Sequence, residues 1–182
     1  MDASTVTRVA LIGGDGIGPE VTEEAVKAMS AACGGDAFRF DRLPYCADFY
    51  LETGKSLPEG ELLRFKRDYD AIFLGALGDP RVPDMRHARD ILLGARMKLD
   101  LYINKRPVRL LKEELCPLKG RRRGDIDIVL YRENTEGAYA GIGGTLHEGT
   151  DDEIAVTEMV ATRRGVERIV RAAFEDARSN GR

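Results

Sequence analysis

The 182-residue sequence has no tryptophan and only three cysteines, Cys33, Cys46 and Cys116. Their odd number and the lack of a CxxC spacing argue against a disulfide framework and against a zinc finger. The two histidines, His87 and His147, stand far apart and outside any HExxH pattern, so they do not predict a metal site. We interpret the cysteines as the reduced thiols of a cytoplasmic protein.

Long apolar runs and an excess charge of one sign are also missing. No run approaches the roughly 18 residues of a membrane span, and the first residues lack the basic and apolar segments of a secretory signal. The 28 Lys and Arg nearly balance the 31 Asp and Glu, so no basic field exists to hold a nucleic-acid backbone. We therefore expect neither a membrane nor a nucleic acid as a partner.

What is present is an alternation of short apolar runs with segments suited to helices. Residues 8–12, after Arg8, and residues 71–74 are short apolar runs that end at glycines, as strands buried on both faces of a parallel sheet do. Between them, Pro19 marks the first turn of a helix. We expect its buried stripe to consist of Val21, Ala25, Met29 and Ala32. The pattern predicts an α/β protein with an open sheet and flanking helices.

The second half of the chain continues this alternation. Residues 84–98 suit a helix, and residues 99–106 alternate between apolar and polar over a strand that Pro107 would end. A further apolar strand is predicted over residues 125–131, and Thr162 would open a last helix. The best candidate for a domain boundary lies near residue 98.

A glycine-rich segment, residues 13–20 (GGDGIGPE), falls at the first strand-to-helix turn. Its backbone amides and the helix dipole could attract an anion. The Rossmann spacing fails, because Pro19 and Val21 stand where a glycine or alanine would be required. The glycines could equally serve only a tight turn and close helix packing. The sequence leaves both interpretations open.

Three arginines, Arg96, Arg106 and Arg132, lie near the ends of predicted strands. The planar fork of arginine suits carboxylates, and Arg132 ends a strand, where ligands bind in open α/β sheets. Tyr139, amid glycines, could donate a proton or could merely pack. We take these four side chains as candidates for a site that binds an organic acid.

Four motifs in order resemble one protein family. They are residues 14–21 (GDGIGPEV), 75–80 (GALGDP), 99–107 (LDLYINKRP) and 131–137 (YRENTEG). Through them the chain resembles the β-decarboxylating dehydrogenases of isopropylmalate, isocitrate, homoisocitrate and tartrate, but only the first half or so of the family's chain. The resemblance implies an isopropylmalate dehydrogenase-like open sheet, not a Rossmann fold, that is incomplete at the C-terminus.

The resemblance also implies a domain plan and a reaction. Residues 1–98 would be the first part of a large nucleotide-binding domain, and residues 99–182 the first part of a small domain for dimerisation and substrate binding. The reaction would oxidise a 2-hydroxy dicarboxylic acid with NAD and Mg²⁺ or Mn²⁺ and then release a carboxylate. NADP stays open as the cofactor. The complete enzyme would be a homodimer, and this chain alone is expected to be inactive.

Individual residues match the family's functional positions. Arg96, Arg106 and Arg132 match the arginines that bind substrate carboxylates, and Tyr139 matches the catalytic tyrosine. The expected cofactor-binding residues near the nicotinamide and its ribose are Gly75, Leu77, Gly78, Asp79 and Arg89. Arg89 departs from the pattern, since the family often has an acidic residue there. No metal ligand is expected in this chain, because the family's metal aspartates and catalytic lysine come later.

The choice of substrate depends on Leu92 and Leu93. In a helix they would lie one turn before Arg96 and line the pocket without offering any hydrogen-bond donor. We therefore expect 3-isopropylmalate, the substrate of leucine biosynthesis. Residues 133–137 look more like the isocitrate and tartrate branches, so isocitrate-, homoisocitrate- and tartrate-type enzymes remain alternatives. A truncated, non-catalytic paralogue that binds a partner subunit is another.

Overall fold

The computed structural model describes residues 6–181 and forms two compact units. The first unit ends at Leu99 and the second begins at Asp100. Each unit is considered by itself below.

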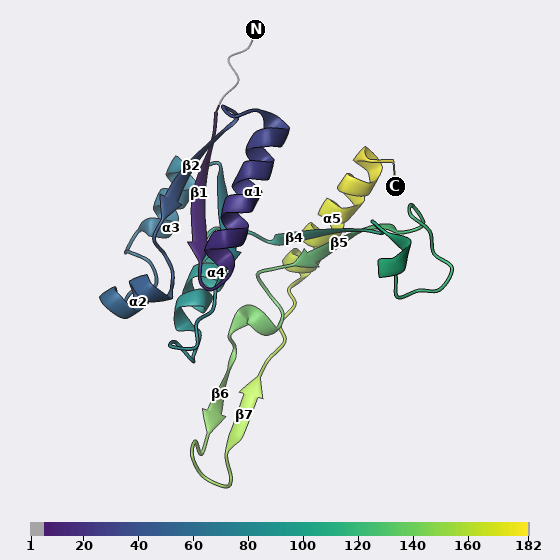
Figure 1. Cartoon of the computed structure of the whole chain (residues 1–182). Coiled ribbons are helices and arrows are strands. Elements are labelled where there is room, and N and C mark those ends of the chain that lie inside the picture. Colours follow the sequence, from purple (N-terminus) through teal and green to yellow (C-terminus); the bar gives the residue numbers. More distant parts are fainter. Residues whose placement is uncertain (1–5, 182) are drawn as a thin grey trace. The chain divides into compact units, whose positions relative to one another are not determined.

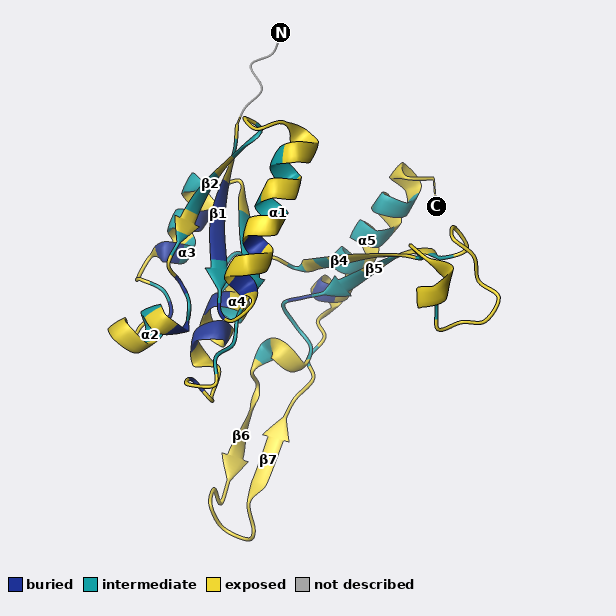
Figure 2. Ribbon diagram, viewed as in Figure 1, coloured by how far each residue is buried: buried dark blue, intermediate teal, exposed yellow. Residues whose placement is uncertain are grey.

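The first unit is built on a parallel sheet of three strands (Figure 1). They are β1 (Thr7–Gly14), β2 (Phe38–Leu43) and β3 (Ala71–Ala76), in the order β2-β1-β3. The central strand is the most buried part of the sheet, and its residues 9–12 are at most 2% exposed (Figure 2). Both predicted strands are therefore confirmed, but only β1 is buried on both faces, because Ile72, Phe73 and Leu74 of β3 are only partly buried.

Helices flank this sheet. They are α1 (Gly18–Cys33), α2 (Ala47–Thr53), α3 (Glu61–Asp68) and α4 (Arg86–Lys98). Ala10 and Ile12 pack against Phe65 of α3 and Ile91 of α4. Since side chains alternate along a strand, the other buried residues of β1 point to the opposite face, where α1 contacts β1 and β3. The open sheet thus has helices on both faces.

The stripe expected on α1 is only partly correct, because Ala25 and Met29 are half-buried but Val21 and Ala32 are not. Its fully buried residues are Gly18 and Thr22, whereas Val21 is 45% exposed and Ala32 is exposed. The reason is close packing, because a Cβ on Gly18 would lie 2.8 Å from the carbonyl oxygen of Ala76. This approach fixes the rotation of α1 and turns Thr22 inward, where its hydroxyl donates to the carbonyl of Gly18 at 2.5 Å.

The second unit holds two antiparallel pairs and a long helix. The pairs are β4 (Ile103–Arg109) with β5 (Asp127–Glu133) and β6 (Gly143–Leu146) with β7 (Ile154–Thr157). The helix is α5 (Arg163–Ser179), and short 3₁₀ turns occur at Glu113–Leu115 and Ala138–Ala140. The expected opening of the last helix at Thr162 is confirmed, because the Thr162 hydroxyl accepts from the Gly165 N–H at 3.0 Å.

Two expectations for this unit are corrected. The strand predicted from residue 99 begins at Ile103, because Leu99 caps α4 and Asp100 has a positive φ of 51°. Pro107 does not end it but pairs with Val129 inside it. Among the described residues β4 pairs with β5 alone, so a proline can lie in this edge strand.

No helix within residues 6–181 is both long and apolar enough to span a membrane.

Candidate functional site

The pairing of β4 with β5 places two of the candidate arginines on one face. Asn104 lies opposite Arg132, and Arg106 lies opposite Leu130. Because paired residues and residues two apart share a face, Arg106 and Arg132 are diagonal neighbours on the same side. The Arg106 Nε–H donates to Asn104 Oδ1 at 2.8 Å. Arg132 therefore ends a strand of an antiparallel pair, and the assumption that it lies in the open parallel sheet is wrong.

Helix α5 packs on the opposite face of this pair. The Lys105 ammonium donates to Asp176 Oδ1 at 2.6 Å, and the Arg168 guanidinium donates to Glu133 Oε1 at 2.8 Å. Lys105 and Glu133 alternate with the arginine-bearing positions along their strands, so they point the other way. Within this unit, the face of Arg106 and Arg132 is the one that α5 leaves uncovered.

Tyr139 lies next to Arg132. It is carried by the 3₁₀ turn Ala138–Ala140, between Gly137 and Gly141, which have positive φ angles of 76° and 69°. The Arg132 guanidinium stands over the tyrosine ring, 5.0 Å from its centroid, and Tyr139 is 41% exposed. Such a cation–π contact is worth about 0.5–1 kcal/mol at an exposed site and restrains the ring. The structure therefore joins Arg132 to Tyr139 and places Arg106 on the same strand face as Arg132.

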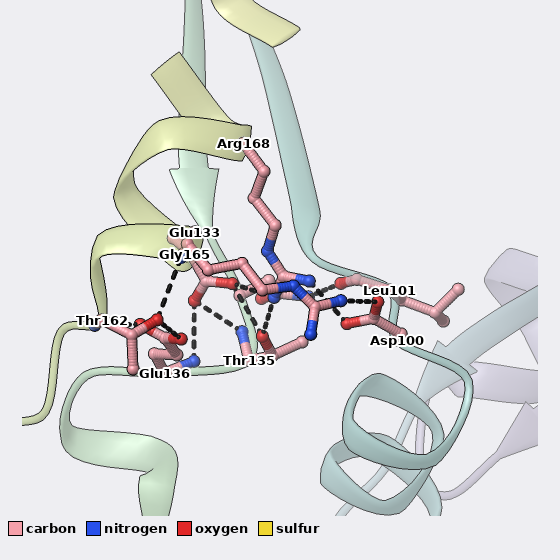
Figure 3. A network of polar contacts seen from close by, with 10 residues as sticks. Asp100, Leu101, Glu133, Thr135, Glu136, Thr162, Gly165 and Arg168 are labelled. Carbon is pink, nitrogen blue, oxygen red and sulfur yellow. Dashed lines mark hydrogen bonds and ion pairs between the residues drawn. The ribbon is translucent and has the colours of Figure 1, made fainter. Parts of the chain in front are cut away.

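A network of polar contacts supports the segment between Arg132 and Tyr139 (Figure 3). The Glu133 carboxylate accepts from the N–H of Thr135 at 2.8 Å, from its hydroxyl at 2.7 Å and from the N–H of Glu136 at 2.7 Å. Arg168 adds its bond to Glu133 and a second to Asp100 at 2.8 Å. Sequence reasoning missed Arg168, because only its position on a distant helix brings it here.

The next residues are also used inside the fold. Glu136 accepts from the N–H and hydroxyl of Thr162 at 2.8 and 2.5 Å, which ties it to the start of α5. Asn134 is 6% exposed and donates to the carbonyl of Leu101 at 3.1 Å. The motif at residues 133–137 therefore braces the segment between Arg132 and Tyr139.

Glu133 makes this brace sensitive to acid. Burial works to raise the pKa of Glu133, but hydrogen bonds from Thr135, Arg168 and Glu136 outweigh it and hold the pKa below its usual value. A lowered pKa means that the carboxylate stabilises the folded state above the unfolded value of about 4.3 and loses this effect as the pH falls through the folded value.

Glu133→Gln should lower the stability of the second unit by about 1–3 kcal/mol at pH 7, because buried donors lose an ionised acceptor. The difference from the unaltered chain should shrink below about pH 4.3. Urea unfolding between pH 3 and pH 7 measures this, with the exposed Glu148→Gln as the control. A difference that stays constant with pH would contradict the ionic role of Glu133.

The remaining substrate candidates lie on α4 of the first unit. One side of this helix is buried, and it consists of His87, Ala88 and Ile91. Leu92 is 37% exposed, and Leu93 and Arg96 are half-buried. The expected helix is confirmed, so Leu92 lies one turn before Arg96 on the same side. The exposed Arg89, three residues before Leu92, belongs to this side as well.

The expected cofactor residues Gly75 to Asp79 lie at the carboxyl end of β3, the edge where open α/β sheets bind ligands. A Cβ on Gly75 would lie 2.2 Å from the carbonyl oxygen of Gly13, so this glycine serves strand packing. Leu77 packs partly against the core. The N–H of Gly78 donates to an Asp15 carboxylate oxygen at 2.8 Å.

The Asp79 carboxylate accepts three hydrogen bonds from Arg81. The donors are the backbone N–H of Arg81 at 2.8 Å, its Nε at 2.9 Å and a terminal guanidinium nitrogen at 2.7 Å. These bonds lower the pKa of Asp79 to about 2. The carboxylate is 17% exposed and keeps lone pairs that Arg81 does not use, so it can still accept from a ribose hydroxyl. Asp79 therefore keeps the capacity to accept a further hydrogen bond, and Gly78 beside it is half-exposed.

No three His, Cys, Asp or Glu side chains within residues 6–181 are grouped so that they could hold a metal ion.

Comparisons with known proteins agree on one family. The model of the isocitrate/isopropylmalate dehydrogenase family matches residues 8–182. The chain is 47% identical to the 3-isopropylmalate dehydrogenase of Thermobifida fusca, covering 97% of this chain and 50% of the relative. It is 44% identical to the decarboxylating D-malate dehydrogenase of Escherichia coli, covering 96% and 49%.

A solved structure, the isocitrate dehydrogenase from Methylococcus capsulatus, is 34% identical with a TM-score of 0.76, covering 97% of this chain and 49% of that one. The chain therefore spans about half the length of the relatives it matches. The predicted fold class is confirmed, since the parallel sheet with flanking helices is shared with this neighbour. The chain belongs to the isocitrate/isopropylmalate dehydrogenase family.

Proposed function

We propose that this chain supplies the substrate-binding part of a β-decarboxylating dehydrogenase that oxidises 3-isopropylmalate with NAD and a divalent metal ion. The observation that supports it best is the uncovered face of β4 and β5, where Arg106 and Arg132 lie together and Tyr139 stacks on Arg132. Two guanidinium groups can neutralise the carboxylates of a malate-type acid. From the resemblance, the proposal includes a cytoplasmic homodimer.

In this proposal the side chains divide the work. Arg106 and Arg132 bind substrate carboxylates, and the resemblance to the family assigns the same role to Arg96. When bound, NAD would supply a hydride acceptor, and a divalent metal ion, Mg²⁺ or Mn²⁺, would supply a Lewis acid for the substrate oxygen. The loop with Gly78 and Asp79 holds the nicotinamide end of the cofactor. Arg132 restrains the ring of Tyr139, whose hydroxyl donates a proton to the carbon that has lost carbon dioxide.

The side group of the substrate decides between related acids. Leu92 lies one turn from Arg96 and, like Leu93, offers no hydrogen-bond donor. Burying a three-carbon isopropyl group at about 0.8 kcal/mol per carbon gives roughly 2 kcal/mol, or about thirtyfold in kcat/KM. A third carboxylate facing leucines would instead lose its hydration without gaining a partner. The site therefore favours 3-isopropylmalate over malate and rejects isocitrate more strongly.

Two fusion enzymes test this proposal. Residues 1–182 are joined to the remaining half of the 3-isopropylmalate dehydrogenase of Thermobifida fusca or of the D-malate dehydrogenase of Escherichia coli. Both fusions should prefer 3-isopropylmalate to malate by about thirtyfold in kcat/KM, because the selecting leucines come from this chain. The chain alone should show no turnover.

Leu92→Ala should reduce this preference by about fivefold, because Leu92 is one of two leucines beside the isopropyl group and would supply about half of the roughly 2 kcal/mol. Leu63→Ala, at a 72% exposed leucine of α3, is the matched control and should leave the preference unchanged. A preference that follows the donor of the second half would show that the leucines do not face the substrate. Higher kcat/KM for isocitrate, homoisocitrate or tartrate would favour those alternatives, and inactivity of both fusions would favour the non-catalytic paralogue.

A further inference from the structure

A buried carboxylate at the end of β1 joins three separate segments of the first unit. Asp15 is 8% exposed. It accepts from the N–H of Ala47 at 2.6 Å, from the N–H of Gly78 at 2.8 Å and from Nε2 of His87 at 2.8 Å. Its own N–H donates to the carbonyl of Ala76 at 2.7 Å. One residue thus connects the start of α2, the loop after β3 and the first turn of α4.

His87 is the most unusual partner in this set, because its side chain is 0% exposed. Burial works to raise the pKa of Asp15, but the bonds from Ala47, His87 and Gly78 outweigh it and lower the pKa, so the group is an ionised acceptor. Nε2 must therefore carry the hydrogen. Nδ1 is buried without a partner among the described residues. Within residues 6–181 the bond to Asp15 is the one hydrogen bond of this ring.

The loop that Asp15 holds has little regular structure of its own. Gly78 has a φ of 151°, a conformation that residues with side chains rarely adopt, and a Cβ there would lie 2.9 Å from the methyl of Met85. Its N–H is fixed by Asp15 rather than by a strand neighbour. His87 lies two residues after Met85 and belongs to α4, the helix that also carries Leu92 and Arg96. It contacts the same Asp15 carboxylate oxygen that accepts from the Gly78 N–H.

We propose that Asp15 and His87 are positioning residues, which hold the Gly78 loop in the conformation that receives the nicotinamide end of the cofactor. The inference rests on the proposed function for the identity of the ligand. His87 contacts neither substrate nor cofactor in this scheme. It acts through Asp15, and Asp15 acts through the Gly78 amide.

Amide hydrogen exchange in the 182-residue chain tests the structural half of the proposal. His87→Leu removes the donor, and exchange at Gly78 should rise about tenfold while exchange at Ala10 and Ile12 of β1 stays unchanged. His87→Gln, whose amide can donate from nearly the position of Nε2, should restore slow exchange. Tyr45→Phe is the matched control, because it removes an equally buried bond, from the Tyr45 hydroxyl to Glu61 at 2.6 Å.

Kinetics of the two fusion enzymes test the functional half. His87→Leu should raise KM for NAD about tenfold and change kcat by less than about twofold, and His87→Gln should reverse this. Parallel changes in kcat and in both KM values, or the same changes in Tyr45→Phe, would show a merely structural role and overturn the proposal. Inactive fusions would count against the proposed function, whereas the exchange measurement would still decide whether the pair holds the loop.

The unaltered chain provides a test that needs no variant. Nitrogen NMR of the His87 ring should show the hydrogen on Nε2 between pH 6 and pH 8, and the Gly78 amide should be protected. A ring with its hydrogen only on Nδ1, or a Gly78 amide that exchanges as fast as an open loop, would overturn the proposal even if His87→Leu did not fold.

Discussion

Gly14→Ala should cost the first unit more than about 4 kcal/mol, a size reserved for severe backbone conflicts. Gly14 has a positive φ of 80°, and a Cβ built there would lie 1.9 Å from the carbonyl oxygen of Ala76 and 2.9 Å from its carbon. Both atoms belong to the backbone of β3, which pairs with β1, so neither can rotate away. Relief would require the two strands to separate at this end.

Gly16→Ala is the matched control, two residues away in the same turn. Gly16 also has a positive φ, of 56°, but a Cβ there would meet nothing within 4 Å. Only backbone strain remains, which costs about 1–2 kcal/mol. Urea unfolding of the two variants separates the terms. Equal losses would show that the approach of β1 to β3 is not the reason for glycine at position 14.

The surroundings of Gly14 and Gly18 bear on the role of the glycine-rich segment, which the sequence leaves open. The GGDGIGPE segment was equally compatible with an anion-binding turn and with close packing. The structure favours packing for Gly14 and Gly18, because the space that their side chains would need is filled by the backbone of Ala76 and Gly13. No local pattern could reveal this, since Ala76 is distant in sequence and approaches only through strand pairing.

Features with a local cause were predictable. The buried strands follow from apolar runs, α4 from a helical composition, and the start of α5 from Thr162, which caps its own helix. Features that depend on distant partners were missed. The inward turn of Thr22 results from the contact of Gly18 with β3, and the inclusion of Pro107 in β4 results from its edge position.

The candidate site divides in the same way. Charge and the family motifs identified Arg106, Arg132 and Tyr139, but only the pairing of β4 with β5 shows that the two arginines share a face. No local pattern indicates that Glu133 and Glu136 contact α5 and the residue before it, because their partners Arg168 and Thr162 lie on a distant segment. Their structural role therefore becomes visible only in the folded unit.

Tyr139→Phe should lower kcat of the fusion enzymes by about 10² to 10⁴, the usual contribution of a general acid. The phenyl ring should keep its place beneath the Arg132 guanidinium, which stands 5.0 Å from the ring centroid, so this proposed carboxylate ligand should not be disturbed. KM for the 2-hydroxy acid should therefore change by no more than a few-fold, because only an interaction of the transition state has been removed.

Tyr131→Phe provides the control for this last change. Tyr131 also lies beneath a cation, Lys105, 5.6 Å from its ring centroid, but it belongs to the opposite face of β5. Removing its hydroxyl should leave kcat within about twofold, because a change away from the reacting atoms touches no interaction special to the transition state. If Tyr139→Phe behaved like Tyr131→Phe, the hydroxyl would carry no proton in the reaction, and the stacked ring would serve only to hold Arg132 in place.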